Sequence, residues 1–166
     1  DTARAEGVSV ISVRCFQEER ELAFGLVIGL VGAVLEAESD AGNAMAAAWW
    51  RPEVARLLPE LGPPPTSALD NVAAQARFYE AICALLTDRL TAGRGLLVVD
   101  DLHWPDDASL GLPGSLANRL RGRPLLIVAT LRPEEISASH AVHRLLAGAR
   151  RGRTADVVVL GRLSAG

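Results

Sequence analysis

The feature that most constrains this sequence is an apolar run that ends in two adjacent carboxylates. Residues 96–99 are Leu-Leu-Val-Val, and Asp100 and Asp101 follow directly. Four consecutive aliphatic residues, two of them β-branched, predict a strand that is buried on both faces of a parallel sheet. Ligands of open α/β sheets bind outside the carboxyl ends of the strands, and alternation turns neighbouring side chains apart. The sequence therefore predicts that Asp100 and Asp101 lie at a ligand-binding edge.

Two explanations of this acidic pair are open. Acidic residues favour the first turn of a helix, so a strand-to-helix connection uses them without any ligand. Alternatively, one carboxylate holds a magnesium ion and the other orients a water molecule, which is the Walker B arrangement of P-loop ATPases. The pair alone does not decide between these explanations.

Composition bounds the class of protein. The 166 residues fit one domain, and a chain that is 49% hydrophobic and 22% charged with a net charge of −3 is an ordinary globular one. This balance argues against nucleic acid or a membrane surface as the main partner. The longest uncharged apolar run, residues 22–35, is shorter than the ~20 residues that span a bilayer. Cys15 and Cys83 lie in apolar segments, and no signal peptide opens the chain, so we expect reduced thiols and a cytoplasmic location.

The order of predicted elements indicates an α/β fold with a parallel sheet. The elements expected are a helix end closed by Gly7, a strand over 8–13, a helix over 22–35, a short helix over 51–61, a helix over 71–90, a strand over 96–101, a helix opened by Asp106 and interrupted by Pro113, a buried strand over 124–130, a helix over 139–149 and a buried strand over 156–160. The helix expected over 71–90 has its core face at Val72, Ala76, Tyr79, Cys83, Leu86 and Leu90. His140 and His143 have a spacing that zinc sites use, but no further ligands are evident.

Two segments together resemble a particular ATPase group. Residues 97–104, Leu-Val-Val-Asp-Asp-Leu-His-Trp, resemble the Walker B segment of the signal-transduction (STAND-type) P-loop ATPases of the AAA-like superfamily. Residues 126–135, Leu-Ile-Val-Ala-Thr-Leu-Arg-Pro-Glu-Glu, resemble their sensor 1 strand, here expected over 124–132. This group occurs in large LuxR-type transcriptional regulators and in cyclase- or kinase-fused regulators.

The resemblance implies a fold, a function and a set of residue roles. The fold would be a three-layer P-loop NTPase-like parallel sheet with helices on both faces. The function would be an ATP-binding and ATP-hydrolysing switch that controls an attached output domain, such as a DNA-binding domain, outside this chain. Asp100 would coordinate Mg²⁺, Asp101 would position or activate the attacking water, and Arg132 would sense the γ-phosphate of ATP with Thr130 beside it. For His103 and Trp104 we expect packing alone.

The sequence departs from this group at one important place. The Walker A loop and the strand before it do not occur, and no lysine is present to contact phosphate, since all 17 basic residues are arginine. Residues 1–7 look like the end of the helix after that loop, so we expect a fragment with poor nucleotide affinity. A non-catalytic remnant that neither binds nor hydrolyses ATP is the alternative. The missing strand would lie between the strands over 125–129 and 157–160, so we expect those two to pair directly, or the chain to self-associate or be partly unfolded.

Overall fold

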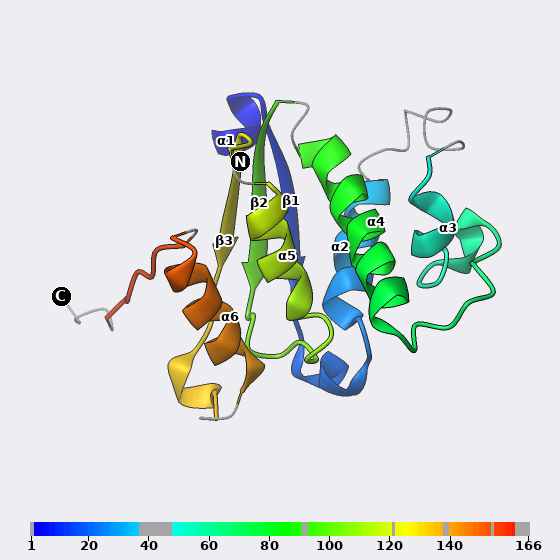
Figure 1. The fold of residues 1–166 in the computed structure, drawn as a ribbon. Helices are drawn as coiled ribbons and strands as arrows, with labels where there is room; N and C mark the ends of the chain where they lie inside the picture. The colour runs from blue at the N-terminus through cyan, green and yellow to red at the C-terminus, as the bar shows by residue number, and fades with distance from the viewer. Residues whose placement is uncertain are drawn as a thin grey trace.

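The centre of the computed structural model is a three-stranded parallel sheet (Figure 1). Its strands are β1 (Val8–Arg14), β2 (Arg94–Asp100) and β3 (Leu125–Ala129), with β2 in the middle. The structure describes residues 2–36, 48–90, 93–120, 122–137, 140–153 and 155–161. The predicted α/β class, built on a parallel sheet, is confirmed.

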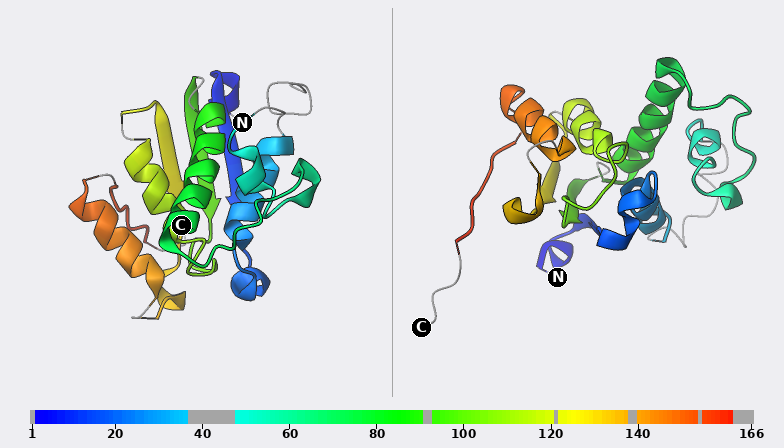
Figure 2. Two further views of the ribbon diagram at one scale, coloured as in Figure 1. Left: turned by 45° about the vertical axis from the view of Figure 1, so that its right-hand side comes forward. Right: turned by 90° about the horizontal axis from the view of Figure 1, so that it is seen from below.

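The helices lie unequally on the two faces of the sheet. They are α1 (Thr2–Ala5), α2 (Gly25–Glu36), α3 (Arg51–Val54), α4 (Val72–Leu90), α5 (Gly111–Arg119) and α6 (Ala141–Arg151), with single 3₁₀ turns η1 (Gln17–Glu21), η2 (Pro59–Leu61) and η3 (Pro133–Glu135). The chain crosses the sheet in one direction, from β1 to β2 to β3, and right-handed crossovers then place the connecting helices on one face. Figure 2 shows α2, α4, α5 and α6 on that face, and the short α1 on the opposite side.

The core lies between the sheet and these helices. In the paired register Ile11 lies beside Leu97, and Leu97 lies beside Ile127, so one row of side chains crosses the sheet toward the helices. Leu97 is buried, as are Ile82 on α4 and Val31 on α2. Burying each such side chain is worth about 1.5–3 kcal/mol, so this row and its helical partners hold the strands in place.

The opposite face of the sheet is less covered than the sequence predicts. Leu96 and Val98 of β2 are half-buried, and Leu126 of β3 is 61% exposed. The prediction that residues 124–130 form a strand buried on both faces is therefore wrong. Among the described helices only the four-residue α1 lies on this face in Figure 2, so the apolar side chains of β3 that point this way have no helix layer to pack against.

The predicted last strand does not form. Residues 155–161 have no regular secondary structure, and the side chains of Val157 to Leu160 are exposed. The expected pairing of this segment with β3 is wrong, since the segment runs away from the sheet in Figure 2. Apolar composition produces a strand only where a neighbouring strand supplies hydrogen bonds and a second layer supplies contacts.

The helices follow the sequence prediction with shifted ends. A glycine at φ +74°, Gly7, follows α1, as expected; Asp1 lies outside the described residues. The predicted helix over 51–61 is only the four-residue α3, followed by the separate turn η2. The carboxylate of Asp106 accepts a hydrogen bond from the Ser109 amide in a turn before α5, which begins at Gly111. Pro113 thus lies in the first helical turn, where its missing donor is not needed.

The long helix α4 is buried along only part of its predicted stripe. Asn71 caps it, since its Oδ1 accepts a hydrogen bond of 2.9 Å from the Ala74 amide. Cys83, Leu86 and Leu90 are buried, and burial raises the pKa of the Cys83 thiol to about 11, consistent with the core role assigned to it. Val72, however, is 83% exposed, so the first turn of α4 does not contact the core.

We predict that Gly95→Ala destabilises the protein, whereas Gly93→Ala does not. A Cβ added at Gly95 would lie 2.2 Å from the carbonyl oxygen of Leu90 and 3.0 Å from Leu125 Cδ1, so backbone must move. Overpacking of this kind costs about 1–3 kcal/mol. A Cβ at Gly93 meets nothing within 4 Å. Urea unfolding measures both free energies, and equal values for the two variants would contradict the prediction.

Candidate functional site

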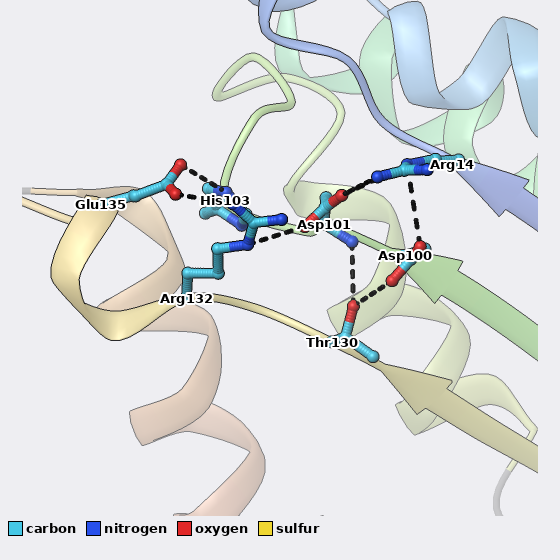
Figure 3. A network of polar contacts seen from close by, with 7 residues as sticks. All are labelled: Arg14, Asp100, Asp101, His103, Thr130, Arg132 and Glu135. Carbon is cyan, nitrogen blue, oxygen red and sulfur yellow. Dashed lines mark hydrogen bonds and ion pairs between the residues drawn. The ribbon is translucent and has the colours of Figure 1, made fainter. Parts of the chain in front are cut away.

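The carboxyl ends of the three strands bring the predicted site residues together. Arg14 ends β1 and is the register partner of Asp100, which ends β2. Thr130 directly follows β3, and Asp101 and Arg132 lie close by in the connecting loops (Figure 3). Parallel strands expose their carboxyl ends at one edge, which is where ligands of α/β sheets bind.

The two aspartates have different surroundings. Asp101 has a left-handed backbone, with φ 59°, which ends the strand; aspartate adopts this conformation more readily than most residues. Its side chain is 10% exposed, whereas that of Asp100 is 44% exposed. The pair therefore offers one open carboxylate and one that is nearly enclosed.

The Thr130 hydroxyl joins both aspartates. Its Oγ1 accepts a hydrogen bond of 3.0 Å from the Asp101 amide and donates one to Oδ1 of Asp100. On either side of this bridge, the Thr130 amide donates to the Val99 carbonyl at 3.0 Å and the Leu102 amide donates to the Thr130 carbonyl at 2.8 Å. Thr130 thus fixes the turn that follows β2 and the orientation of the exposed carboxylate.

Two arginines from neighbouring segments compensate the charge of Asp101. Arg14 donates to Oδ2 of Asp101 from Nε at 3.3 Å and from Nη2 at 3.2 Å, and its Nε lies 3.8 Å from Asp100. Nε of Arg132 lies 3.7 Å from Oδ1 of Asp101, a looser contact. A carboxylate that is removed from water needs such partners, since an unpaired buried charge costs several kcal/mol.

Arg132 has its closest contact with Glu135 rather than with Asp101. Nη1 of Arg132 donates to Oε1 of Glu135 at 2.9 Å, and Oε2 of Glu135 lies 3.1 Å from Nε2 of His103 (Figure 3). This arrangement lowers the pKa of the Glu135 carboxyl, chiefly through the hydrogen bond from Arg132 and further through that from His103. The same hydrogen bond with Glu135 raises the pKa of Arg132.

Sequence reasoning located some of these residues and missed others. Asp100, Asp101, Thr130 and Arg132 lie together as predicted; their roles in binding and catalysis are not tested by this geometry. The contact of Arg14 with the acidic pair was missed, although a charge at the end of a neighbouring parallel strand was the available signal. Glu135 was missed, and His103, expected only to pack, has a polar partner.

The chemistry of the edge fits a magnesium ion that is shared with phosphate groups. Mg²⁺ prefers oxygen ligands and is usually held by one or two carboxylates together with phosphates and water. Asp100 offers such a carboxylate at the open edge of the sheet. In the part of the chain that the structure describes, no group of three or more His, Cys, Asp or Glu residues could hold a metal alone. His140 instead caps α6, where its Nδ1 accepts a hydrogen bond from the Val142 amide.

A separate hollow of about 290 Å³ lies between the loop after β2 and the start of α6. It is lined by Arg20, Pro105, Asp106, Asp107, Ser137, His140 and Ala141. Neither Asp100 nor Asp101 lines it, so the acidic pair lies on an open edge rather than in this hollow.

Comparison with known families agrees with this geometry. A family model described as an AAA ATPase domain matches residues 1–128. The chain belongs to this AAA ATPase domain family. The match includes the acidic pair and ends just before Thr130 and Arg132. Searches of curated proteins and of solved structures each found no match. None of the described helices of this AAA domain is long and apolar enough to cross a membrane.

We predict that Thr130→Val loosens the turn at Asp101, whereas Thr130→Ser does not. Valine has nearly the shape of threonine but leaves the Asp101 amide and Asp100 Oδ1 without the hydroxyl, a loss of about 1 kcal/mol for each bond. Amide hydrogen exchange at Asp101 should become faster in the valine variant alone. Equal exchange in wild type and Thr130→Val would show that the hydroxyl does not hold the turn.

Proposed function

We propose that this AAA domain is a regulatory switch that binds and hydrolyses ATP and controls an attached output domain outside the chain. The observation that supports it most is the meeting of Asp100, Asp101 and Arg132 at the carboxyl edge of a parallel sheet in a member of this family. The Asp-Asp-Leu-His-Trp and Thr-Leu-Arg-Pro-Glu-Glu segments favour a regulator of the LuxR-associated, STAND-type group.

Each residue has a role that suits its surroundings. Asp100, the more exposed carboxylate, would hold Mg²⁺, which neutralises charge on the phosphates when bound. Asp101, enclosed and fixed by Arg14, would orient the attacking water and accept its proton. Thr130 would keep the Asp100 carboxylate in position beside the nucleotide.

Arg132 is suited to exchange partners when nucleotide binds. Its side chain is 54% exposed and its contact with Asp101 is 3.7 Å long, so a phosphate group can replace that contact at little cost. Hydrogen bonds between arginine and phosphate are charge-assisted and often bidentate. Movement of Arg132 from Asp101 to the γ-phosphate would free one oxygen of Asp101 for water. Asp101 would then be able to accept a proton only when nucleotide is bound.

The alternative is a scaffold that keeps the fold but does not use ATP. It is favoured by the absence of any lysine, since no Walker A motif can be written in these 166 residues. Reading the coding sequence upstream of residue 1 distinguishes the two functions. A G-x-x-x-x-G-K-[ST] motif there supports the switch, and its absence supports the scaffold.

In the protein with its natural upstream sequence, Asp101→Asn should lower ATP hydrolysis by about 100-fold or more and leave ATP binding largely intact. Asp100→Asn should also weaken magnesium-dependent binding, because it removes the carboxylate assigned to the ion. Asp107→Asn is the matched control, since this exposed aspartate lies in the neighbouring loop. Hydrolysis measured by phosphate release should be unchanged in the control; equal hydrolysis by wild type and Asp101→Asn would refute the assignment.

We also propose that two copies of the chain associate through the outer edge of β3. β3 pairs only with β2 among the described strands, so its other edge presents free backbone donors and acceptors beside the exposed Leu126. Unpaired strand edges with apolar side chains are prone to pair with another chain.

Leu126→Lys should therefore shift the protein toward the monomer, because a charged side chain on an edge strand opposes pairing. Val72→Lys is the control: it places the same charge at a more exposed apolar site on α4. Size-exclusion chromatography with light scattering, over a range of concentrations, gives the mass. A wild-type monomer at every concentration would exclude this association.

A further inference from the structure

His103 is a buried polar residue that packing alone does not explain. It is 1% exposed and lies in the turn just after the acidic pair, with its ring 4.6 Å from that of Trp104. Its Nε2 lies 3.1 Å from Glu135, whereas its Nδ1 has no hydrogen-bond partner among the described residues. A buried polar group costs free energy unless it is paired, so an apolar residue would fill this position better. The contact with Glu135 is the feature that requires a hydrogen-bond donor at this position.

Glu135 links this buried ring to the arginine of the candidate site. One carboxylate oxygen contacts Nε2 of His103 and the other accepts from Nη1 of Arg132 at 2.9 Å. An ionised carboxylate only accepts hydrogen bonds, so Nε2 of His103 carries the proton in this arrangement. Two hydrogen bonds thus connect the buried ring of His103, through Glu135, to Arg132 at the edge of the sheet (Figure 3).

We propose that His103 and Glu135 are positioning residues, which hold the guanidinium of Arg132 at the edge of the sheet beside Asp101. His103 supplies a fixed donor because it is enclosed, and Glu135 transmits this fixed position to Arg132 through its second oxygen. The inference deepens the proposed function and rests on it for the role of Arg132 toward phosphate, whereas the series of contacts stands on geometry alone.

The arrangement of contacts explains why Arg132 needs an anchor. Its side chain is long and largely exposed, and its contact with Asp101 is loose. Without Glu135 the guanidinium would occupy many rotamers and meet a phosphate only part of the time. Anchoring one nitrogen, Nη1, leaves Nε and Nη2 available for Asp101 or a ligand. Preorganisation of this kind lowers the entropic cost of each later contact.

Substitutions at His103 distinguish the effect of its Nε2 donor from the effect of packing by its buried ring. In His103→Gln the side-chain amide nitrogen lies near the position of Nε2, so the donor to Glu135 is retained. In His103→Asn the shorter amide reaches only the position of Nδ1, and in His103→Phe the ring is kept without any donor. Circular dichroism and thermal unfolding establish that each variant of the 166-residue protein folds.

The first measurement uses nuclear magnetic resonance on this protein without nucleotide. In His103→Asn and His103→Phe the carboxylate of Glu135 loses its buried donor, so exchange with water of the Arg132 Nη1 protons, which donate to that carboxylate, should quicken about tenfold. The pKa of Glu135, followed through its carboxyl carbon, should rise toward its ordinary value, since one hydrogen bond that lowers it is gone. His103→Gln should restore both readouts. Equal readouts in the Gln and Asn variants would overturn the proposal.

A second variant keeps the proposal testable if the His103 variants do not fold. Glu135 is partly exposed, so Glu135→Gln removes the charge without opening the core. Exchange of the Arg132 Nη1 protons should quicken in this variant as well, because a neutral amide oxygen accepts more weakly than a carboxylate, and unchanged exchange would overturn the proposal. Glu134→Gln is the matched control, because Glu134 affects Arg132 only through its charge and has the weakest effect of the groups acting on it.

The nucleotide measurement tells failure of the anchor from failure of the proposed function. In the protein with its natural upstream sequence, His103→Asn should lower kcat for Mg-ATP hydrolysis about tenfold with KM little changed, and His103→Gln should restore it. Normal kcat in His103→Asn would overturn the proposal. In a further outcome, the wild-type protein lacks ATP hydrolysis while the His103→Gln and His103→Asn variants still differ in the magnetic-resonance measurement. That result would support the positioning role of His103 and Glu135 and refute the proposed function.

Discussion

The nearly enclosed negative charge of Asp101 is the constraint on which the edge of this sheet depends. A carboxylate with so little access to water is stable only beside positive partners, and here they come from both neighbouring strand ends. Arg14 arrives from β1 and Arg132 from the loop after β3, while the Thr130 hydroxyl holds the turn itself. The order of the strands, β1-β2-β3, brings these groups together, and the ion pairs of Asp101 in turn favour this order and register.

The sequence predicted the parts of this arrangement that depend on local pattern. The apolar run before Asp100 and Asp101 indicated a central strand that ends at a ligand-binding edge, and the resemblance of residues 126–135 to a sensor 1 strand placed Thr130 and Arg132 beside it. The contact of Arg14 depends on strand register, and the link between His103 and Glu135 depends on how a loop and a 3₁₀ turn pack. Neither the strand register nor the packing of this loop against the turn can be obtained from residue types alone.

The errors in the prediction have a common physical origin. Residues 157–160 and the strand β3 were both expected to be buried because they are apolar, yet burial requires a covering layer. The connecting helices cover one face of the sheet, since the chain crosses it in a single direction, and only the short α1 lies on the other face. Hydrophobicity therefore identified which segments can form a core, and topology decided which of them do.

The long sequence separation within the site has a consequence for how the domain folds. Arg14 and Asp101 are 87 residues apart, and Thr130 lies 29 residues after Asp101. Contacts this distant form only after the loops between them have closed, which is an entropically slow step. The acidic edge therefore cannot be complete before β1, β2 and β3 have paired, and it is lost when those strands separate. Any probe placed at Asp101 would follow completion of the whole sheet, rather than the formation of a single element.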